Sequence, residues 1–119
     1  MTIKRISVPI FDNVEVYMSD EIMKDCPPWR ACRELKFDHD PNDHEETSGY
    51  VLASTNGDIF MGINAGEPLK VIAHECVHAA WEILDFVGVK VNYKNHEMLA
   101  YLVDWLFENY IKKFKISID

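Results

Sequence analysis

The segment VIAHECVHAAW, residues 71–81, constrains the fold of this chain more than any other stretch. Apolar residues recur at helical spacing from Leu69 to Val87, which predicts a helix that opens after Pro68 and stops at Gly88. Because residues 71–81 are apolar nearly all round, we expect this helix to lie buried in the centre of the fold. The two histidines and the glutamate within it therefore need a chemical explanation.

Short runs rich in β-branched and aromatic residues predict strands at Ile3–Val8, Val14–Tyr17, Tyr50–Ser54 and Ile59–Ile63. The last two flank Asn56-Gly57, a dipeptide typical of a type I′ hairpin turn, in which both central residues need positive φ. A second long helix is expected to begin near Asn95 and to end in a cluster of lysines, Lys112, Lys113 and Lys115. Residues 20–36 stay open between helix and strand, and residues 38–49 are expected to form an acidic loop.

The composition narrows the function classes. The chain carries 12 Lys and Arg against 20 Asp and Glu, and this net charge of −8 argues against general nucleic-acid binding, which needs a basic face. Cys26, Cys32 and Cys76 form no CxxC pair, and their odd number is typical of a reducing cytoplasm. Neither a signal peptide nor a run of about 18 apolar residues is recognisable. We therefore expect one cytoplasmic domain over residues 1–119 without a membrane partner; its oligomeric state is not predicted.

The segment HECVH carries the predicted chemistry. His74 and His78 stand four positions apart and project from the same helix face, so both imidazoles can reach one zinc ion. Glu75 lies about 100° further round the helix, where it can reach a water on the metal rather than the metal itself. Zinc lowers the pKa of its bound water toward about 7. Glu75 can then act as general base while that water attacks a peptide carbonyl.

Other interpretations of these residues stay open. The histidines could be core side chains whose ring nitrogens are satisfied by hydrogen bonds. Cys76 points about 200° away from His74, so we expect it to pack in the core and not to bind the same ion. The third protein ligand that zinc needs is expected to be Glu97, 19 positions after His78, at the start of the second helix. The alternatives are an ordinary acid at a helix N-terminus, or a ligand from the histidines His39, His44 and His96.

HECVH followed by NHEMLAYLVDW resembles the gluzincin metallopeptidases, over roughly residues 50–110. The resemblance implies a small zincin-like α+β fold: a twisted antiparallel or mixed β-sheet with a hairpin, packed on a buried HExxH helix, plus a second long C-terminal helix. It implies one zinc ion per chain, with His74, His78 and Glu97 as ligands and Glu75 as general base. It also implies that a peptide substrate pairs with an edge strand, here Ile59–Ile63.

The chain also looks similar to small, single-domain gluzincin-like proteins, some of which are encoded by bacteriophages. If this chain is encoded by a bacteriophage, we expect it in the cytoplasm of the host cell. It departs from many gluzincins at Tyr101, where an acid usually orients a zinc histidine. The Tyr101 hydroxyl could serve instead, or its ring could simply pack. Low-ranking candidates for oxyanion stabilisation are His96, Tyr93, Tyr50 and His44.

Three functions remain open. The favoured one is a zinc-dependent metallopeptidase that hydrolyses peptide bonds. The alternative is a regulatory or structural interaction protein that keeps a zincin fold and its zinc but does not turn over. A third is a zinc hydrolase acting on a non-peptide bond, or an unrelated interaction module. The sequence does not predict the substrate or whether cleavage is internal or terminal.

Overall fold

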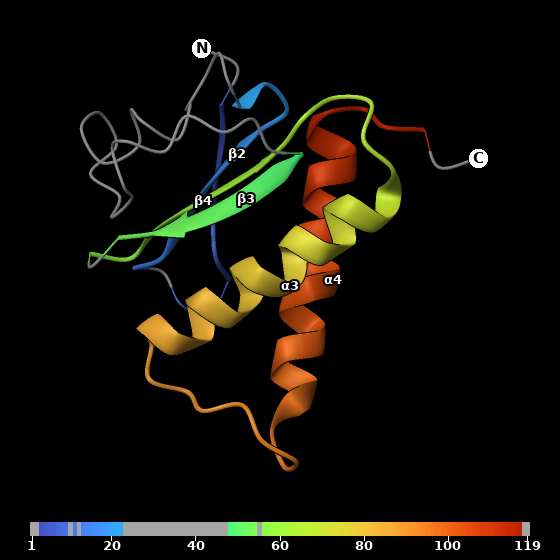
Figure 1. Cartoon of the computed structure of the whole chain (residues 1–119). Helices are drawn as coiled ribbons and strands as arrows, with labels where there is room; N and C mark the ends of the chain where they lie inside the picture. Colours follow the sequence, from blue (N-terminus) through green and yellow to red (C-terminus); the bar gives the residue numbers. More distant parts are fainter. Residues whose placement is uncertain (1–2, 10, 12, 23–47, 55, 118–119) are drawn as a thin grey trace.

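A computed structural model of the chain describes residues 3–9, 11, 13–22, 48–54 and 56–117. Its elements are β1 (Lys4–Ser7), β2 (Glu15–Ser19), β3 (Gly49–Ala53), β4 (Asp58–Ile63), α3 (Leu69–Phe86) and α4 (His96–Lys113). A four-stranded mixed sheet with two long helices confirms the α+β class (Figure 1). Most of the open segment 20–36 and of the expected loop 38–49 lies outside the described residues, as do Cys26, Cys32, His39 and His44.

The sheet has the strand order β1-β2-β4-β3. β1 is antiparallel to β2, β2 is parallel to β4, and β4 is antiparallel to β3. The prediction that Ile59–Ile63 forms an edge strand is therefore wrong, because β2 and β3 pair with β4 on both sides. Val16 lies opposite Ile59 and Met18 opposite Met61 in the parallel pairing. In the described sheet, β3 is the outermost strand on this side.

The β3–β4 hairpin is confirmed, but its turn is not of type I′. Ala53 pairs with Ile59, and the N–H of Ser54 donates to the carbonyl of Asp58 at 2.9 Å, so the loop has three residues. Gly57 has a φ of 97°. A three-residue loop needs a left-handed residue only at its last position, which glycine provides without strain.

The main core lies between one face of the sheet and the two helices. Alternate residues of the central strands point into it, namely Val16, Met18, Ile59, Met61 and Ile63. From α3 it receives Ile72, Cys76, Ala79, Ala80, Ile83 and Leu84, and from α4 it receives Leu102, Leu106 and Tyr110. In Figure 1, α3 passes beside β3 and α4 crosses behind α3. Burial of this apolar surface is the main force that holds α3 in place.

The expectation that α3 lies buried in the centre of the fold holds for one face of the helix and is wrong for the opposite face. Val77 is 43% exposed and Trp81 is 50% exposed, and His74 and His78 are exposed on the same side of the helix. The core covers the face that carries Cys76, and β3 lies along one flank. The helix is therefore a boundary between core and solvent, although its sequence is apolar nearly all round.

Tyr110 ties α4 to the ends of two central strands. Its hydroxyl lies 2.6 Å from the carbonyl oxygen of Ile63, to which it donates, and 3.2 Å from that of Ser19. The side chain is buried, and burial raises the pKa of its phenol. No helix in the described part of the chain is long and apolar enough to cross a membrane.

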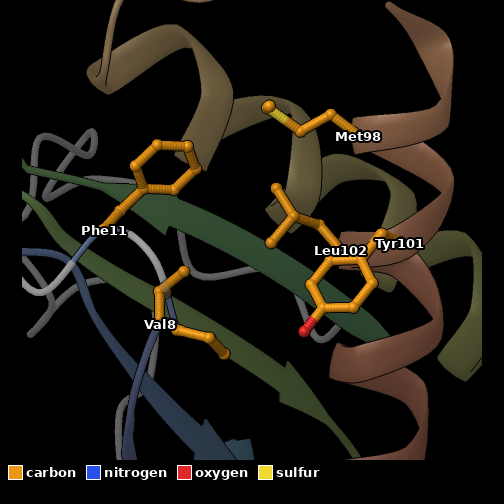
Figure 2. Close-up of a pocket in the computed structure, with 6 residues that line it drawn as sticks. Val8, Phe11, Met98, Tyr101 and Leu102 are labelled. Carbon is orange, nitrogen blue, oxygen red and sulfur yellow. The ribbon is translucent and has the colours of Figure 1, made fainter.

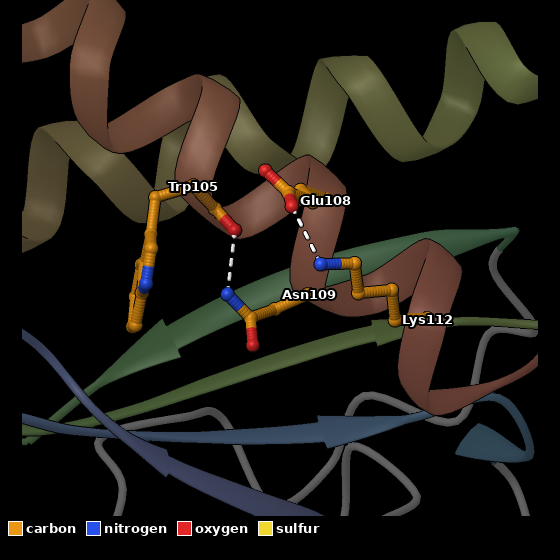
Figure 3. Close-up of polar contacts among 4 residues, drawn as sticks. All are labelled: Trp105, Glu108, Asn109 and Lys112. Atoms are coloured by element: carbon orange, nitrogen blue, oxygen red, sulfur yellow. Dashed lines mark hydrogen bonds and ion pairs between the residues drawn. The ribbon is translucent and has the colours of Figure 1, made fainter.

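The exposed side of α4 carries local contacts between residues four positions apart (Figure 3). Lys112 Nζ lies 2.6 Å from Glu108 Oε1, and this hydrogen bond lowers the pKa of the Glu108 carboxyl. Asn109 Nδ2 donates to the carbonyl of Trp105 at 2.9 Å. The expected lysine cluster lies at the C-terminal end of α4, where Lys112 and Lys113 occupy the last turn and suit the helix dipole.

Both helices end in the same hydrogen-bond pattern, with a left-handed residue just past the helix. After α3 this residue is Gly88, with a φ of 81°, and the N–H of Val89 donates to the carbonyl of Leu84. After α4 it is Lys115, with a φ of 53°, and the N–H of Ile116 donates to the carbonyl of Ile111. Only glycine adopts this conformation without steric cost.

We predict opposite effects of two substitutions at these matched ends. Gly88→Ala should lower the free energy of unfolding by about 1 kcal/mol, because an added Cβ meets no atom within 4 Å and only the backbone conformation is penalised. Lys115→Gly should raise it by about 0.5 kcal/mol, because relief of strain exceeds the added entropy of the unfolded chain. Urea unfolding measures both; the same sign of change in both variants would contradict this account.

Candidate metal centre

The imidazoles of His74 and His78 meet on the exposed face of α3. Their Nε2 atoms lie 3.2 Å apart, their ring centroids are 4.8 Å apart, and the rings are inclined at 71°. This close approach follows from the helix, because residues four positions apart stand one turn above each other. The core fixes the rotation of the helix by burying Cys76, Ala79 and Ile83 on the opposite side.

The separation of the two nitrogens suits a shared zinc ion. Two zinc–nitrogen bonds of about 2.0–2.1 Å at a tetrahedral angle place the nitrogens about 3.3 Å apart. The observed Nε2–Nε2 distance of 3.2 Å is close to this value. It also suits a hydrogen bond between the rings, if one Nε2 carries a proton and the other does not. The geometry therefore fits two metal ligands, and their role as ligands stays a prediction.

Glu75 is held on the flank of α3 that faces β3. The residue is only 7% exposed, and burial raises the pKa of its carboxyl, although His74 and His78 act to lower it. Its side chain packs against the backbone of Gly49 in β3, where an added Cβ would lie 2.9 Å from Glu75 Cγ. The absence of a side chain at Gly49 thus makes room for the carboxyl beside the histidines.

Two hollows extend from this point between β3 and α3, and both are lined by Gly49, His74 and Glu75. The first is also lined by Ser48, Lys70 and Val71. The second is also lined by Tyr50, Val51, His78 and Glu82. We call the two hollows together the β3–α3 groove. The groove runs past the histidines, so a molecule lying in it is within reach of Glu75.

Four residues that line the groove were not predicted from the sequence as part of the site, namely Ser48, Gly49, Lys70 and Glu82. The position of Glu82 beside the site could have been predicted from helical spacing, because Glu82 stands four positions after His78 and seven after Glu75 on the same flank of the helix. Tyr50 was a low-ranking oxyanion candidate, and it does line the groove. Its ring also packs on Phe60, with centroids 5.3 Å apart. A role in oxyanion stabilisation stays a prediction.

The structure does not bring Glu97 together with the two histidines. It is exposed in the first turn of α4, and the described residues contain no group of three His, Cys, Asp or Glu side chains that could hold a metal ion. The connector before α4 is held by Asn95, whose Oδ1 accepts from the N–H of Asn92 at 2.7 Å. The same side chain donates to the carbonyl of Lys90. Glu97 as third ligand therefore stays a prediction.

The remaining candidates on α4 lie outside the β3–α3 groove. Tyr101 lines a small apolar pocket with Val8, Phe11 and Met98, among others (Figure 2). The residues that line this pocket include neither histidine. His96 is exposed at the start of α4, with its ring centroid 6.3 Å from that of Tyr93. Tyr101 contributes to this pocket although it is 49% exposed, and its role in orienting a zinc histidine stays a prediction. The position of His96 provides no support for it in the site.

Cys76 faces the core, as its position on the helix indicates. It is fully buried, and burial raises the pKa of its thiol to about 12, with a further contribution from the charge of Glu75. A thiol with this pKa is almost entirely protonated at neutral pH. Cys76 is therefore a packing residue of α3.

We predict that Gly49→Ala destabilises the metal-free protein by about 1–3 kcal/mol, because the new Cβ meets Glu75 Cγ at 2.9 Å and the carbonyl of Gly62 at 3.0 Å. In a Glu75→Ala background the first of these contacts is gone, so the cost should fall by about 1 kcal/mol. Urea unfolding of the two single variants, the double variant and the parent measures this coupling. Strict additivity would show that the two residues do not share the space.

We also predict that Cys76 resists alkylation. Iodoacetamide at pH 8 should leave it unmodified in the folded protein and modify it in urea, because the reaction needs an accessible thiolate. The rate in the folded state should rise only as the pH approaches the raised pKa of about 12. Peptide mapping by mass spectrometry reads this residue separately from Cys26 and Cys32. Rapid labelling at pH 8 without unfolding would contradict the assignment.

Comparison with protein-family models, with curated proteins and with solved structures finds no match to this chain. The resemblance to gluzincins therefore rests on the residues of HECVH and NHEMLAYLVDW alone.

Proposed function

We propose that this protein is a zinc-dependent metallopeptidase that hydrolyses peptide bonds in the β3–α3 groove. One observation carries the proposal: the Nε2 atoms of His74 and His78 converge to 3.2 Å on an exposed helix face, beside the buried carboxyl of Glu75. Two solvent-facing imidazoles at this distance suit a shared zinc ion. A purely structural core helix has no need of either of them.

In this proposal each of the three residues has one task. His74 and His78 would hold zinc, which when bound would lower the pKa of a coordinated water toward about 7. Glu75 accepts a proton from the attacking water and passes it to the leaving amine. Burial supports this task, because it raises the pKa of the carboxyl and so makes Glu75 a stronger base. Gly49 keeps the carboxyl beside the histidines by leaving space for it.

A peptide is the proposed substrate because of the shape of the groove. It runs between a strand and a helix, is open to solvent, and is lined by residues from both elements. An extended chain can lie along such a groove with its backbone beside the strand, and its side chains then project alternately toward α3 and away from it. Peptide groups pass His74 and Glu75 in this arrangement, which is where the chemistry would occur.

Glu97 remains the proposed third ligand. It belongs to the stretch NHEMLAYLVDW that carries the gluzincin resemblance, and it opens a helix that packs against α3. Because metal binding is coupled to local structure, zinc at this site would have to draw the first turn of α4 and the connector before it toward His74 and His78. An acid provides the oxygen that completes a His-His-Glu ligand set and leaves one position for water.

We predict that Glu75→Gln lowers the rate of peptide hydrolysis about 100-fold or more, because the amide cannot accept the proton. The amide has nearly the same shape, so zinc content and thermal stability should stay close to those of the parent. A library of quenched fluorescent peptides measures turnover, and zinc is measured on the same samples. Asp85→Asn, which removes an exposed acid from the same helix, is the matched control and should keep activity.

Two outcomes would overturn parts of this proposal. Cleavage retained in Glu75→Gln would exclude Glu75 as the general base. A parent protein that binds zinc but cleaves no peptide in the library would favour the alternative function, a zinc-binding regulatory or structural protein without turnover.

A further inference from the structure

The two ends of the β3–α3 groove carry opposite charges. Lys70 lines the hollow on one side of His74 and Glu75, beside Ser48 and Val71. Glu82 lines the hollow on the other side, beside Val51. The groove therefore changes sign along its length, with the proposed reaction centre between the two charges.

We propose that the substrate of this groove is an extended peptide with a negatively charged group at the Lys70 end and a positively charged group at the Glu82 end. This inference rests on the proposed function, since it concerns the peptide that the same site would hold. Lys70 and Glu82 are then specificity residues: each contacts a substrate group on its own side of the bond that is cleaved.

The spacing of the two charges fits such a peptide. Lys70 and Glu82 are 12 positions apart on one helix, which corresponds to about 18 Å along the axis. An extended chain rises about 3.3 Å per residue, so five or six residues cover this distance. Side chains an even number of positions apart project from the same face of an extended chain. Two charges six positions apart, at i and i+6, therefore match the groove, and both side chains can point toward α3.

Among the described residues, the other titratable groups that line the groove do not reverse this polarity. The Lys70 hollow is also lined by His74 and Glu75, and the Glu82 hollow by His74, Glu75 and His78. His74 and Glu75 belong to both hollows, so they do not distinguish the two ends. His78 and Tyr50 are the additional ionisable residues among the described ones at the Glu82 end. In the proposed function His78 is a neutral metal ligand, and a tyrosine phenol is ordinarily uncharged at neutral pH. The difference between the ends is thus set by Lys70 and Glu82.

Both residues are exposed, so the expected effects are moderate. Exposed ion pairs change affinity by about two- to fivefold each, and the effect shrinks at high salt. Lys70 and Glu82 would mainly provide specificity between peptides. Each of them repels a substrate group of like charge at its end of the groove and attracts one of opposite charge. A peptide with the two charges exchanged meets repulsion at both ends at once.

The test uses the full chain with zinc added and two labelled peptides of identical composition. In one, Lys stands six positions after Glu, at i and i+6; the other has the reverse order, and both have capped ends. Fluorescence anisotropy measures binding to the parent and to the double variant Lys70→Glu/Glu82→Lys. The matched control is Lys90→Glu/Asp85→Lys, which exchanges two exposed charges outside the groove.

We expect the parent to bind one order at least about fourfold more tightly, the double variant to prefer the other order, and the control to behave as the parent. Equal affinity for both orders, or an unchanged preference in the double variant, would overturn the inference and leave the peptidase proposal standing. Failure to bind either capped peptide and also the free-ended peptides of the further arm below would overturn both. Peptides with free ends and no charged side chains form a further arm, and tight binding of these alone would assign Lys70 and Glu82 to the terminal groups of a short peptide.

Discussion

The burial of one face of α3 against the sheet and α4 is the constraint on which the rest of this structure depends. Cys76, Ala79 and Ile83 lie in the core, and this fixes the rotation of the helix about its own axis. A rotation by one residue, about 100°, would move His74 into the flank and Glu75 toward the core. The packing that stabilises the fold therefore also determines which side chains face solvent and which face β3.

The site consequently depends on contacts far from the histidines. β3 reaches α3 because β4 lies between β2 and β3, and Gly49 at the start of β3 allows the close approach of Glu75. Tyr110 links α4 to the carbonyl of Ile63, at the end of β4 just before the chain turns into α3. The strand order, Gly49 and the Tyr110 hydroxyl thus all help to position the Glu75 carboxyl. In this position the carboxyl is buried, and burial raises its pKa.

Much of this fold could be predicted from local sequence, and the misses share a physical reason. The four strands, the two helices and the stop at Gly88 follow from periodicity and turn residues, so they are found within a few positions of the expected ones. The edge position of Ile59–Ile63 was wrong because a parallel partner from far upstream, β2, leaves no local signal. The prediction that α3 is buried was wrong for one face of the helix, because residues such as Trp81 are apolar but exposed. In the site, the meeting of His74 and His78 is local and predictable, whereas the role of Gly49 depends on tertiary packing.

The most direct test of the central claim, that His74 and His78 form a zinc site, is the zinc content of protein purified without added metal. Mass spectrometry should be applied to the parent, His78→Ala and Glu97→Ala side by side, before and after addition of zinc. The account predicts one zinc per chain in the parent and a clear loss in both variants. Zinc that is lost from His78→Ala but retained in Glu97→Ala would support the histidine pair as ligands and exclude Glu97 as the third ligand. A parent that takes up no zinc even after addition would contradict the account and leave the two imidazoles as a hydrogen-bonded pair on the surface of a structural helix.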